Sequence, residues 1–180
     1  MTAEMWIIGL VRIVGSLPVL RWPFYGAIVA ILVDQSDLFM MNLLELGGVG
    51  NYQTFDKYLD QVYIGAFLLV ALRWQGADRA VAVGLFAYRL IGFIAFEATQ
   101  SRDVLLLFPN LFEFWFLLVA AKLQFGWQEA LRGRRLAAVV VALVALKLFQ
   151  EYAIHYQRWL DDFTAVEAVE AIWAFLITKG

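Results

Sequence analysis

Ionisable residues inside the apolar segments carry the chemical information of this sequence. They lie on five hydrophobic stretches, and acids outnumber cations among them. A charged group inside a bilayer is costly, so it normally faces protein, water or a bound partner. A single polar pocket, built by several helices, would accommodate all of them. They are Asp34, Asp37, Asp60, Arg89, Glu97, Glu113, Lys147, Glu151 and His155.

Helical spacing places several of these residues on common faces. Residues three or four positions apart lie on the same side of an α-helix. This applies to Asp34 with Asp37, to Asp56 with Asp60, and to the series Lys147, Glu151 and His155.

A proline marks one wall of the expected pocket. Asn110 and Glu113 are three positions apart and directly follow Pro109. Pro109 has no N–H to donate to the Leu105 carbonyl, so the helix should kink or open there. Broken helices at membrane depth are tolerated where they line a cavity.

The surplus of acids predicts a bound cation, because Arg89 and Lys147 are the only firm cations in this group. Carboxylates without thiols or several imidazoles suit a hard ion such as Mg²⁺, Ca²⁺ or Mn²⁺. We assign Asp34, Asp37 and Asp60 as metal ligands. Two alternatives stay open: protonated acids that relay protons, and ion pairs that are purely structural.

Catalytic and binding roles follow from residue type. Carboxyl, imidazole and amine groups transfer protons, and Glu151 lies four residues before His155, where it can orient the imidazole. Arginine, amide and carboxyl groups can bind a polar substrate. The predicted catalytic residues are Glu113, Glu151, His155 and Lys147, and the predicted substrate-binding residues are Arg89, Asn110 and Glu97.

Composition sets the class of protein. Apolar residues make up 63% of the 180 residues, and the mean hydropathy is +0.72. This is typical of a polytopic membrane protein. The absence of cysteine excludes disulfides and thiol chemistry, and a single histidine excludes sites with several imidazoles. No basic stripe suggests nucleic-acid binding. Glu4 and the lack of a basic leader region argue against a cleavable signal.

The apolar segments predict an all-α membrane helix bundle in one domain, residues 1–180. Residues 4–17 are interrupted by Arg12 and Gly15, which favours an interfacial helix within residues 1–20. Thr164 and Glu167 form a capping box that begins a short helix, 164–179, amphipathic or half-inserted. Five segments between residues 22 and 157 are long enough to cross roughly 30 Å of hydrocarbon. They are 22–46, 53–74, 79–99, 103–124 and 135–157.

Basic residues predict the orientation of this bundle. Eight of them cluster at alternate ends of the five spans and three at the opposite ends. Cytoplasmic loops carry the excess of Lys and Arg, which puts the amino terminus in the cytoplasm and the ionisable groups in the outer half of the bilayer. The eight are Arg12, Arg21, Arg73, Arg79, Lys122, Arg132, Arg134 and Arg135.

Two family resemblances arise from the motifs. Asp34-x2-Asp37 followed by Asp56-x3-Asp60 resembles, in degenerate form, the four-aspartate signature of CDP-alcohol phosphotransferases, which implies two divalent metals. Here the gap is one residue longer and Leu38 replaces a glycine. Most of the chain resembles a family of uncharacterised bacterial integral membrane proteins, which implies an inner-membrane location. The motifs include Phe108-Pro109-Asn110 with Phe112-Glu113, and Lys147 with Gln150-Glu151-Tyr152.

Three function classes fit these observations. A membrane-embedded enzyme acting on a lipid or polyprenyl substrate accounts for the mixture of acids, amines and amides. A transporter of a cation or small solute accounts for the surplus of acids. A structural subunit of a membrane complex is the third. The expected partners are membrane lipids and a second copy of the chain.

Overall fold

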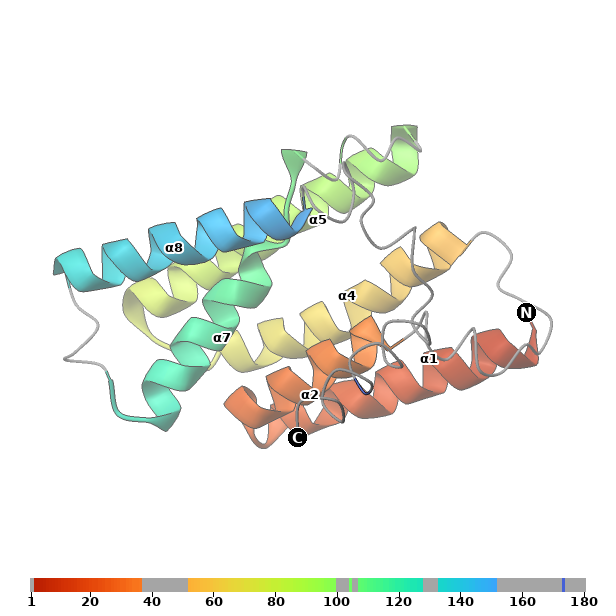
Figure 1. Ribbon diagram of the computed structural model, residues 1–180, viewed down its shortest axis with the longest axis horizontal. Helices are drawn as coiled ribbons and strands as arrows, with labels where there is room; N and C mark the ends of the chain where they lie inside the picture. Colours follow the sequence, from red (N-terminus) through yellow and green to blue (C-terminus); the bar gives the residue numbers. More distant parts are fainter. Residues whose placement is uncertain are drawn as a thin grey trace.

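The computed structural model is all-helical within the residues that it describes, which are 2–36, 52–99, 104, 107–127, 133–151 and 173. Figure 1 shows successive helices running in opposite directions, most of them roughly along the long axis of the molecule and α7 obliquely to it. They are α1 (Ala3–Ser16), the short 3₁₀ helix η1 (Leu17–Leu20), α2 (Pro23–Gln35), α4 (Tyr52–Ala71), α5 (Gly76–Thr99), α7 (Leu111–Gln124) and α8 (Gly133–Glu151).

Local sequence explains where several helices begin. The Thr2 hydroxyl accepts a hydrogen bond from the Met5 amide and caps α1. Pro23 occupies the first turn of α2, where its missing N–H costs nothing. Gly76 and Gly133 begin α5 and α8 with positive φ angles of 57° and 55°, a conformation that glycine adopts without strain.

The helices define two ends of the bundle. One end, which we call the basic end, contains residues 17–22, 72–75 and 125–127, where helices turn back. The other, the opposite end, contains the amino terminus, the end of α2 and the beginning of α4. Six basic residues lie in or next to the turns of the basic end: Arg21, Arg73, Arg79, Lys122, Arg134 and Arg135.

An aromatic core joins α4 to α7. The Phe67 and Phe116 rings stack with centroids 4.2 Å apart, and Trp74 lies 5.1 Å from Phe116 on the side of the basic end. Tyr63 packs against Phe67 from the other side. All four side chains are buried. The centre of the bundle is therefore apolar on the basic side of Tyr63.

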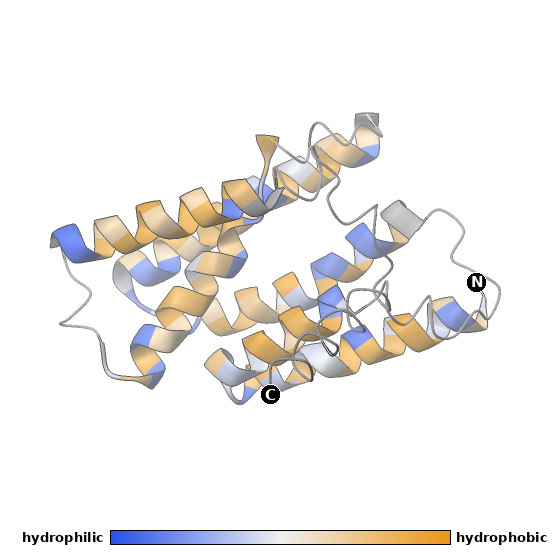
Figure 2. Ribbon diagram, viewed as in Figure 1, coloured by the Kyte–Doolittle hydropathy of each residue, from blue (hydrophilic) through white to orange (hydrophobic). Residues whose placement is uncertain are grey.

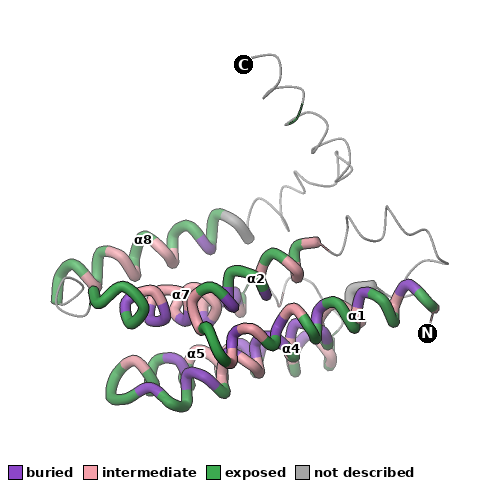
Figure 3. Tube along the Cα trace, turned by 90° about the horizontal axis from the view of Figure 1, so that it is seen from below, coloured by how far each residue is buried: buried purple, intermediate pink, exposed green. Residues whose placement is uncertain are grey.

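Helix α1 has the reverse of the burial pattern of a soluble protein. Its buried face is largely polar, with Glu4, Arg12 and Ser16 spaced four or eight residues apart around Ile8. Its exposed face is apolar: Trp6 is 65% exposed. Figure 2 shows this helix as mostly hydrophobic, and Figure 3 shows exposed and buried residues alternating along it. A helix of this kind suits an apolar solvent.

Two helices in the described part are long and apolar enough to cross a membrane: residues Ala3–Leu20, which combine α1 with η1, and Gly76–Thr99. The all-helical fold is confirmed, whereas the five-span arrangement is not. Only the predicted span 79–99 coincides with such a helix. The other lies in the segment predicted to be interfacial.

The amino-terminal segment differs from the prediction for a physical reason. Arg12 and Gly15 were expected to interrupt an apolar helix. Instead, Arg12 points into the bundle, and Gly15 faces Val33 of α2, with room for little more than a hydrogen. Both residues therefore serve the packing of α1 against its neighbours.

The break at Pro109 is confirmed. Helix α7 begins only at Leu111, and the Asn110 side chain caps it by accepting from the Glu113 amide at 3.4 Å. The remaining 14 residues of α7 are fewer than the 22 predicted for residues 103–124.

Candidate functional site

Arg12 is the centre of a buried ion-pair network. Its Nη2 contacts Oδ1 of Asp34 and lies 2.8 Å from Oδ1 of Asp60, and its Nη1 lies 2.9 Å from Oδ1 of Asp56. The guanidinium of one helix thus joins α1 to α2 and α4. Arginine suits this role because its five N–H groups can serve several carboxylates at once.

Two further cations complete this network. Lys57 Nζ lies 2.7 Å from Oδ2 of Asp56 and 3.2 Å from Oδ2 of Asp60. Arg89 Nη2 of α5 lies 3.6 Å from Oδ2 of Asp60. Three carboxylates therefore face three cations. The acid surplus inferred from the sequence does not exist at this point, because Arg12 lies inside the bundle instead of in a cytoplasmic region and Lys57 joins the acids.

The three aspartates of this network could serve as metal ligands, but an arginine side chain lies among them. Oxygen atoms of Asp34, Asp56 and Asp60 lie within 4.8 Å of one another, close enough to hold a metal ion. Yet Arg12 nitrogens contact all three carboxylates, which places its positive charge among them. An added divalent ion would be repelled by this guanidinium. The network therefore fits a divalent metal poorly, and we derive no chemistry from one.

The open segment at Pro109 receives its hydrogen bonds from α5. Arg89 Nη1 donates to the Phe108 carbonyl at 2.9 Å, and the neighbouring Tyr88 hydroxyl donates to the Leu107 carbonyl. These bonds satisfy backbone acceptors at a break in the helix. Glycine at position 92 lets α5 approach the segment at Phe108 closely. A Cβ at this position would lie 2.3 Å from Cβ of Phe108.

A second polar group lies where α4 meets the beginning of α7. The Tyr63 hydroxyl donates to Oε2 of Glu113 at 3.1 Å, and Asn110 Nδ2 donates to the same oxygen at 3.1 Å. Asn110 Nδ2 also lies 3.1 Å from the Tyr63 oxygen. The Glu113 carboxyl group is thus held by two neutral donors. Such a group can exchange a proton with a bound substrate.

Lys147 approaches this group from α8. Its side chain is buried, and its Nζ lies 5.5 Å from the centroid of the Phe114 ring, within the range of a cation–π interaction. Phe114 is adjacent to Glu113 in the sequence. The charged end of Lys147 therefore lies beside the beginning of α7.

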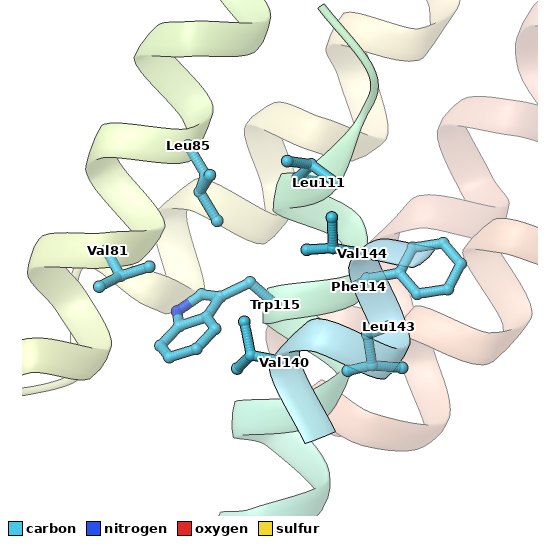
Figure 4. Close-up of a pocket in the computed structure, with 8 residues that line it drawn as sticks. All are labelled: Val81, Leu85, Leu111, Phe114, Trp115, Val140, Leu143 and Val144. Atoms are coloured by element: carbon cyan, nitrogen blue, oxygen red, sulfur yellow. The ribbon is translucent and has the colours of Figure 1, made fainter. Parts of the chain in front are cut away.

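An apolar pocket of about 270 Å³ lies between α5, α7 and α8. Figure 4 shows the Trp115 indole between side chains of α5 and α8. None of the lining residues is fully buried, so the pocket opens on the side of the bundle. They are Val81, Leu85, Leu111, Phe114, Trp115, Val140, Leu143 and Val144.

The structure brings some predicted site residues together and separates others. Asp34, Asp60 and Arg89 belong to the ion-pair network around Arg12. Asn110 and Glu113 belong, with Tyr63, to the second polar group, which we call the Glu113 group. Arg89 joins the two regions through Asp60 and the Phe108 carbonyl. Glu97 lies apart, with its Oε2 3.4 Å from the Tyr58 hydroxyl. Asp37, His155 and the side chain of Glu151 lie outside the described residues.

Four members of the site, Arg12, Asp56, Lys57 and Tyr63, were not among the site residues predicted from the sequence. A signal for Arg12 was present: Glu4, Ile8, Arg12 and Ser16 follow a four-residue spacing that defines one helix face. Tyr63 lies three residues after Asp60 and therefore on nearly the same face of α4. The roles of Arg12 and Tyr63 follow only from the packing of the helices, because their hydrogen-bond partners lie 22 to 50 positions away in the sequence.

Comparison with known proteins adds no family. No protein-family model, no curated protein and no solved structure matches this chain.

Proposed function

We propose that this protein is a membrane-embedded enzyme that acts on a lipid or polyprenyl substrate. The observation that carries the proposal is the position of the apolar pocket beside the Glu113 group. Leu111 and Phe114 line the pocket, and they flank Glu113 in the first turn of α7. A lipid chain in the pocket would bring its polar end to Glu113 and its two donors.

The membrane location is supported by the outward apolar face of α1 and by the two long apolar helices. A bacterial inner membrane, with the basic end in the cytoplasm, accords with the excess of basic residues there. Since α1 packs along α2 and α4 instead of lying apart, we infer that α1 also crosses the bilayer. The amino terminus then lies outside, on the other side of the membrane from the sequence prediction, and α5 makes a second crossing.

Acid–base chemistry is the reaction type that this site favours. Glu113 would take or supply a proton, while Tyr63 and Asn110 orient its carboxyl group and Lys147 adds positive charge nearby. The ion-pair network around Arg12 would hold α1, α2, α4 and α5 in register behind the site. None of these roles needs a metal ion.

An ion pathway is the less favoured function. The stacked Phe67 and Phe116 rings and Trp74 fill the space between the polar groups and the basic end. A hydrated ion would have to displace these buried rings. A polar group separated from the basic end by buried aromatic rings agrees better with chemistry than with transport.

A comparison of lipid extracts tests the proposal. The cells compared express the wild type, Glu113→Gln or Leu146→Ala, with equal amounts of membrane-inserted protein. We expect one lipid class to change in mass with the wild type and to stay unchanged with Glu113→Gln. Leu146→Ala, an exposed substitution on α8, is the matched control and should behave as the wild type. Identical lipid profiles for the wild type and Glu113→Gln would refute an enzymatic role of this site.

A further inference from the structure

The turn between η1 and α2 meets the turn between α4 and α5 at the basic end. Arg73 Nη1 donates to the Leu20 carbonyl at 3.3 Å, across 53 positions of sequence. Leu20 directly precedes Arg21, so the Arg73 guanidinium lies against the backbone beside a second arginine. Both arginines are exposed. The fold therefore holds two cationic side chains at one place, although like charges repel.

The backbone of both turns is fixed by the surrounding structure. The Arg21 amide donates to the Pro18 carbonyl at 3.1 Å, and Val19 of the same turn is fully buried. Arg73 is followed by Trp74, which is buried against the aromatic core. Both arginine side chains thus start from preorganised positions. Preorganisation lowers the free-energy cost of binding a ligand.

The described residues supply no acid to neutralise the two arginines. Asp78, at the beginning of α5, is the described acid of this end, and both of its carboxylate oxygens lie 2.6 Å from Lys122 Nζ. Within the described ranges, neither Arg21 nor Arg73 forms an ion pair. A guanidinium has five N–H groups, and Arg73 uses one of them for the Leu20 carbonyl. The remaining donors suit an oxygen anion.

Aromatic rings mark this end of the bundle as a membrane interface. Phe24 of α2 lies 5.1 Å from Phe125, which stacks on Trp127 with centroids 4.9 Å apart. Trp22, adjacent to Arg21, is 60% exposed. Such rings are enriched at the level of lipid head groups, and the cytoplasmic leaflet carries the anionic lipids. With the basic end in the cytoplasm, the two arginines lie at the level of the phosphates of that leaflet.

We propose that Arg21 and Arg73 bind the phosphate of one anionic phospholipid of the cytoplasmic leaflet. The fork of a guanidinium matches two phosphate oxygens, and two forks contact a phosphodiester from two sides. A choline head group would bring a further positive charge and leave the two arginine charges unmatched. Exposed apolar neighbours of the arginines, Trp22 and Leu72, favour a lipid over a free phosphate ion.

This site is independent of the proposed enzymatic function. The buried rings of Phe67, Phe116 and Trp74 separate it from the Glu113 group. Binding of the phospholipid therefore requires no catalytic role of Glu113, and Glu113→Gln should leave it unchanged.

Native mass spectrometry of the full chain in a neutral detergent tests the inference. It measures the dissociation constants of the first bound phosphatidylglycerol and of the first bound phosphatidylcholine. One basic residue beside an anionic lipid contributes about fivefold in affinity, so the two arginines should favour phosphatidylglycerol by about 25-fold. Equal affinities for the two lipids would overturn the proposal.

Matched substitutions locate the head group. Arg21→Gln and Arg73→Gln should each weaken phosphatidylglycerol binding about fivefold. Arg134→Gln, the matched control, removes the same charge from an exposed position at the start of α8. It should change the affinity by less than about twofold, because screened charges that do not touch the phosphate contribute little. Unchanged affinity in Arg21→Gln, or an equal loss in all three variants, would overturn the assigned site.

The Arg21 variant keeps this test informative about binding. Arg73→Gln also removes the hydrogen bond to the Leu20 carbonyl and can disturb the turn. The Arg21 side chain donates no hydrogen bond to the described residues, so its replacement changes charge without removing a contact of the fold.

Competition by soluble anions separates a lipid from a free phosphate. Inorganic phosphate or glycerol phosphate, in excess over the lipid, should leave phosphatidylglycerol bound, because neither anion has acyl chains to lie beside the exposed apolar residues. Displacement of phosphatidylglycerol by either anion would overturn the lipid assignment.

Discussion

Nη2 of Arg12 lies 2.8 Å from Oδ1 of Asp60, across 48 positions of sequence and between helices α1 and α4. Both side chains are buried. The Arg12 charge would be unfavourable on an isolated apolar helix. Here its ion pair with Asp60 joins α1 to α4. The polar interior of the bundle depends on it.

Removing the Arg12 guanidinium should destabilise the protein strongly. Arg12→Leu leaves Asp34, Asp56 and Asp60 without their shared partner, which we expect to cost about 3–5 kcal/mol of unfolding free energy. Arg21→Leu, at an exposed position, should change it by less than about 0.5 kcal/mol. Reversible unfolding in detergent measures both. Equal effects of the two substitutions would mean that the network contributes nothing.

Divalent metal should matter only when Arg12 is absent. We expect millimolar Mg²⁺ to leave the melting temperature of the wild type unchanged, because the guanidinium lies among the carboxylates. Arg12→Ala should be stabilised by Mg²⁺, since three carboxylates then face one cavity. Adding Asp60→Asn to Arg12→Ala should abolish that gain. A large Mg²⁺ effect on the wild type would restore the metal hypothesis.

Gly92 should be intolerant of a methyl group. In Gly92→Ala the new Cβ would lie 2.3 Å from Cβ of Phe108 and force apart α5 and the segment at Pro109. Overpacking of this kind costs about 1–3 kcal/mol. Gly84→Ala is the matched control on α5, because a Cβ there meets nothing within 4 Å, and it should be neutral or stabilising. Thermal unfolding of both variants checks the prediction, and similar melting temperatures would contradict it.

Tyr63→Phe should weaken the group around Glu113. The substitution removes a donor to Glu113 and an acceptor for Asn110, both largely enclosed by protein. We expect a loss of about 1–3 kcal/mol in unfolding free energy. Tyr58→Phe removes a longer and exposed hydrogen bond to Glu97 and should have almost no effect. If both substitutions lower the unfolding free energy equally little, the hydrogen bonds of Tyr63 do not stabilise the fold.

Cysteine labelling should place the amino terminus outside. The chain has no cysteine of its own, so single exposed replacements report one side each. Ala3→Cys and Ala98→Cys should react with an impermeant maleimide added outside, and Gln75→Cys and Gln124→Cys should not. Labelling of position 3 on the same side as position 75 would contradict the antiparallel packing of α1.

The sequence predicted the parts of the fold that depend on local pattern. The helical segments predicted at 53–74 and 79–99 correspond to α4 and α5 within a few residues, because long apolar stretches bounded by polar residues define their own ends. The break at Pro109 followed from the missing N–H alone. Only local chemistry was needed in each case.

The candidate site was predicted less completely, because its contacts join distant helices. Asp34, Asp60, Arg89 and Glu113 were recognised from their cost inside an apolar segment, and Asn110 from its position after Pro109. The role of Arg12 was not, because an arginine that interrupts a short apolar segment is also typical of a membrane interface. The pocket left no signal at all: its lining residues are ordinary apolar residues, and only packing brings them together.

The buried charge on α1 also bears on how the chain enters a membrane. Arg12 is synthesised before any of the three aspartates that surround it. An arginine at the centre of a helix raises the cost of insertion by about 2.5–3.5 kcal/mol. The first acid to relieve that cost, Asp34, is on the next helix, and η1 with Gly26 holds the two helices in a tight hairpin. During biosynthesis, α1 and α2 should therefore leave the translocation channel together, as a single neutral hairpin.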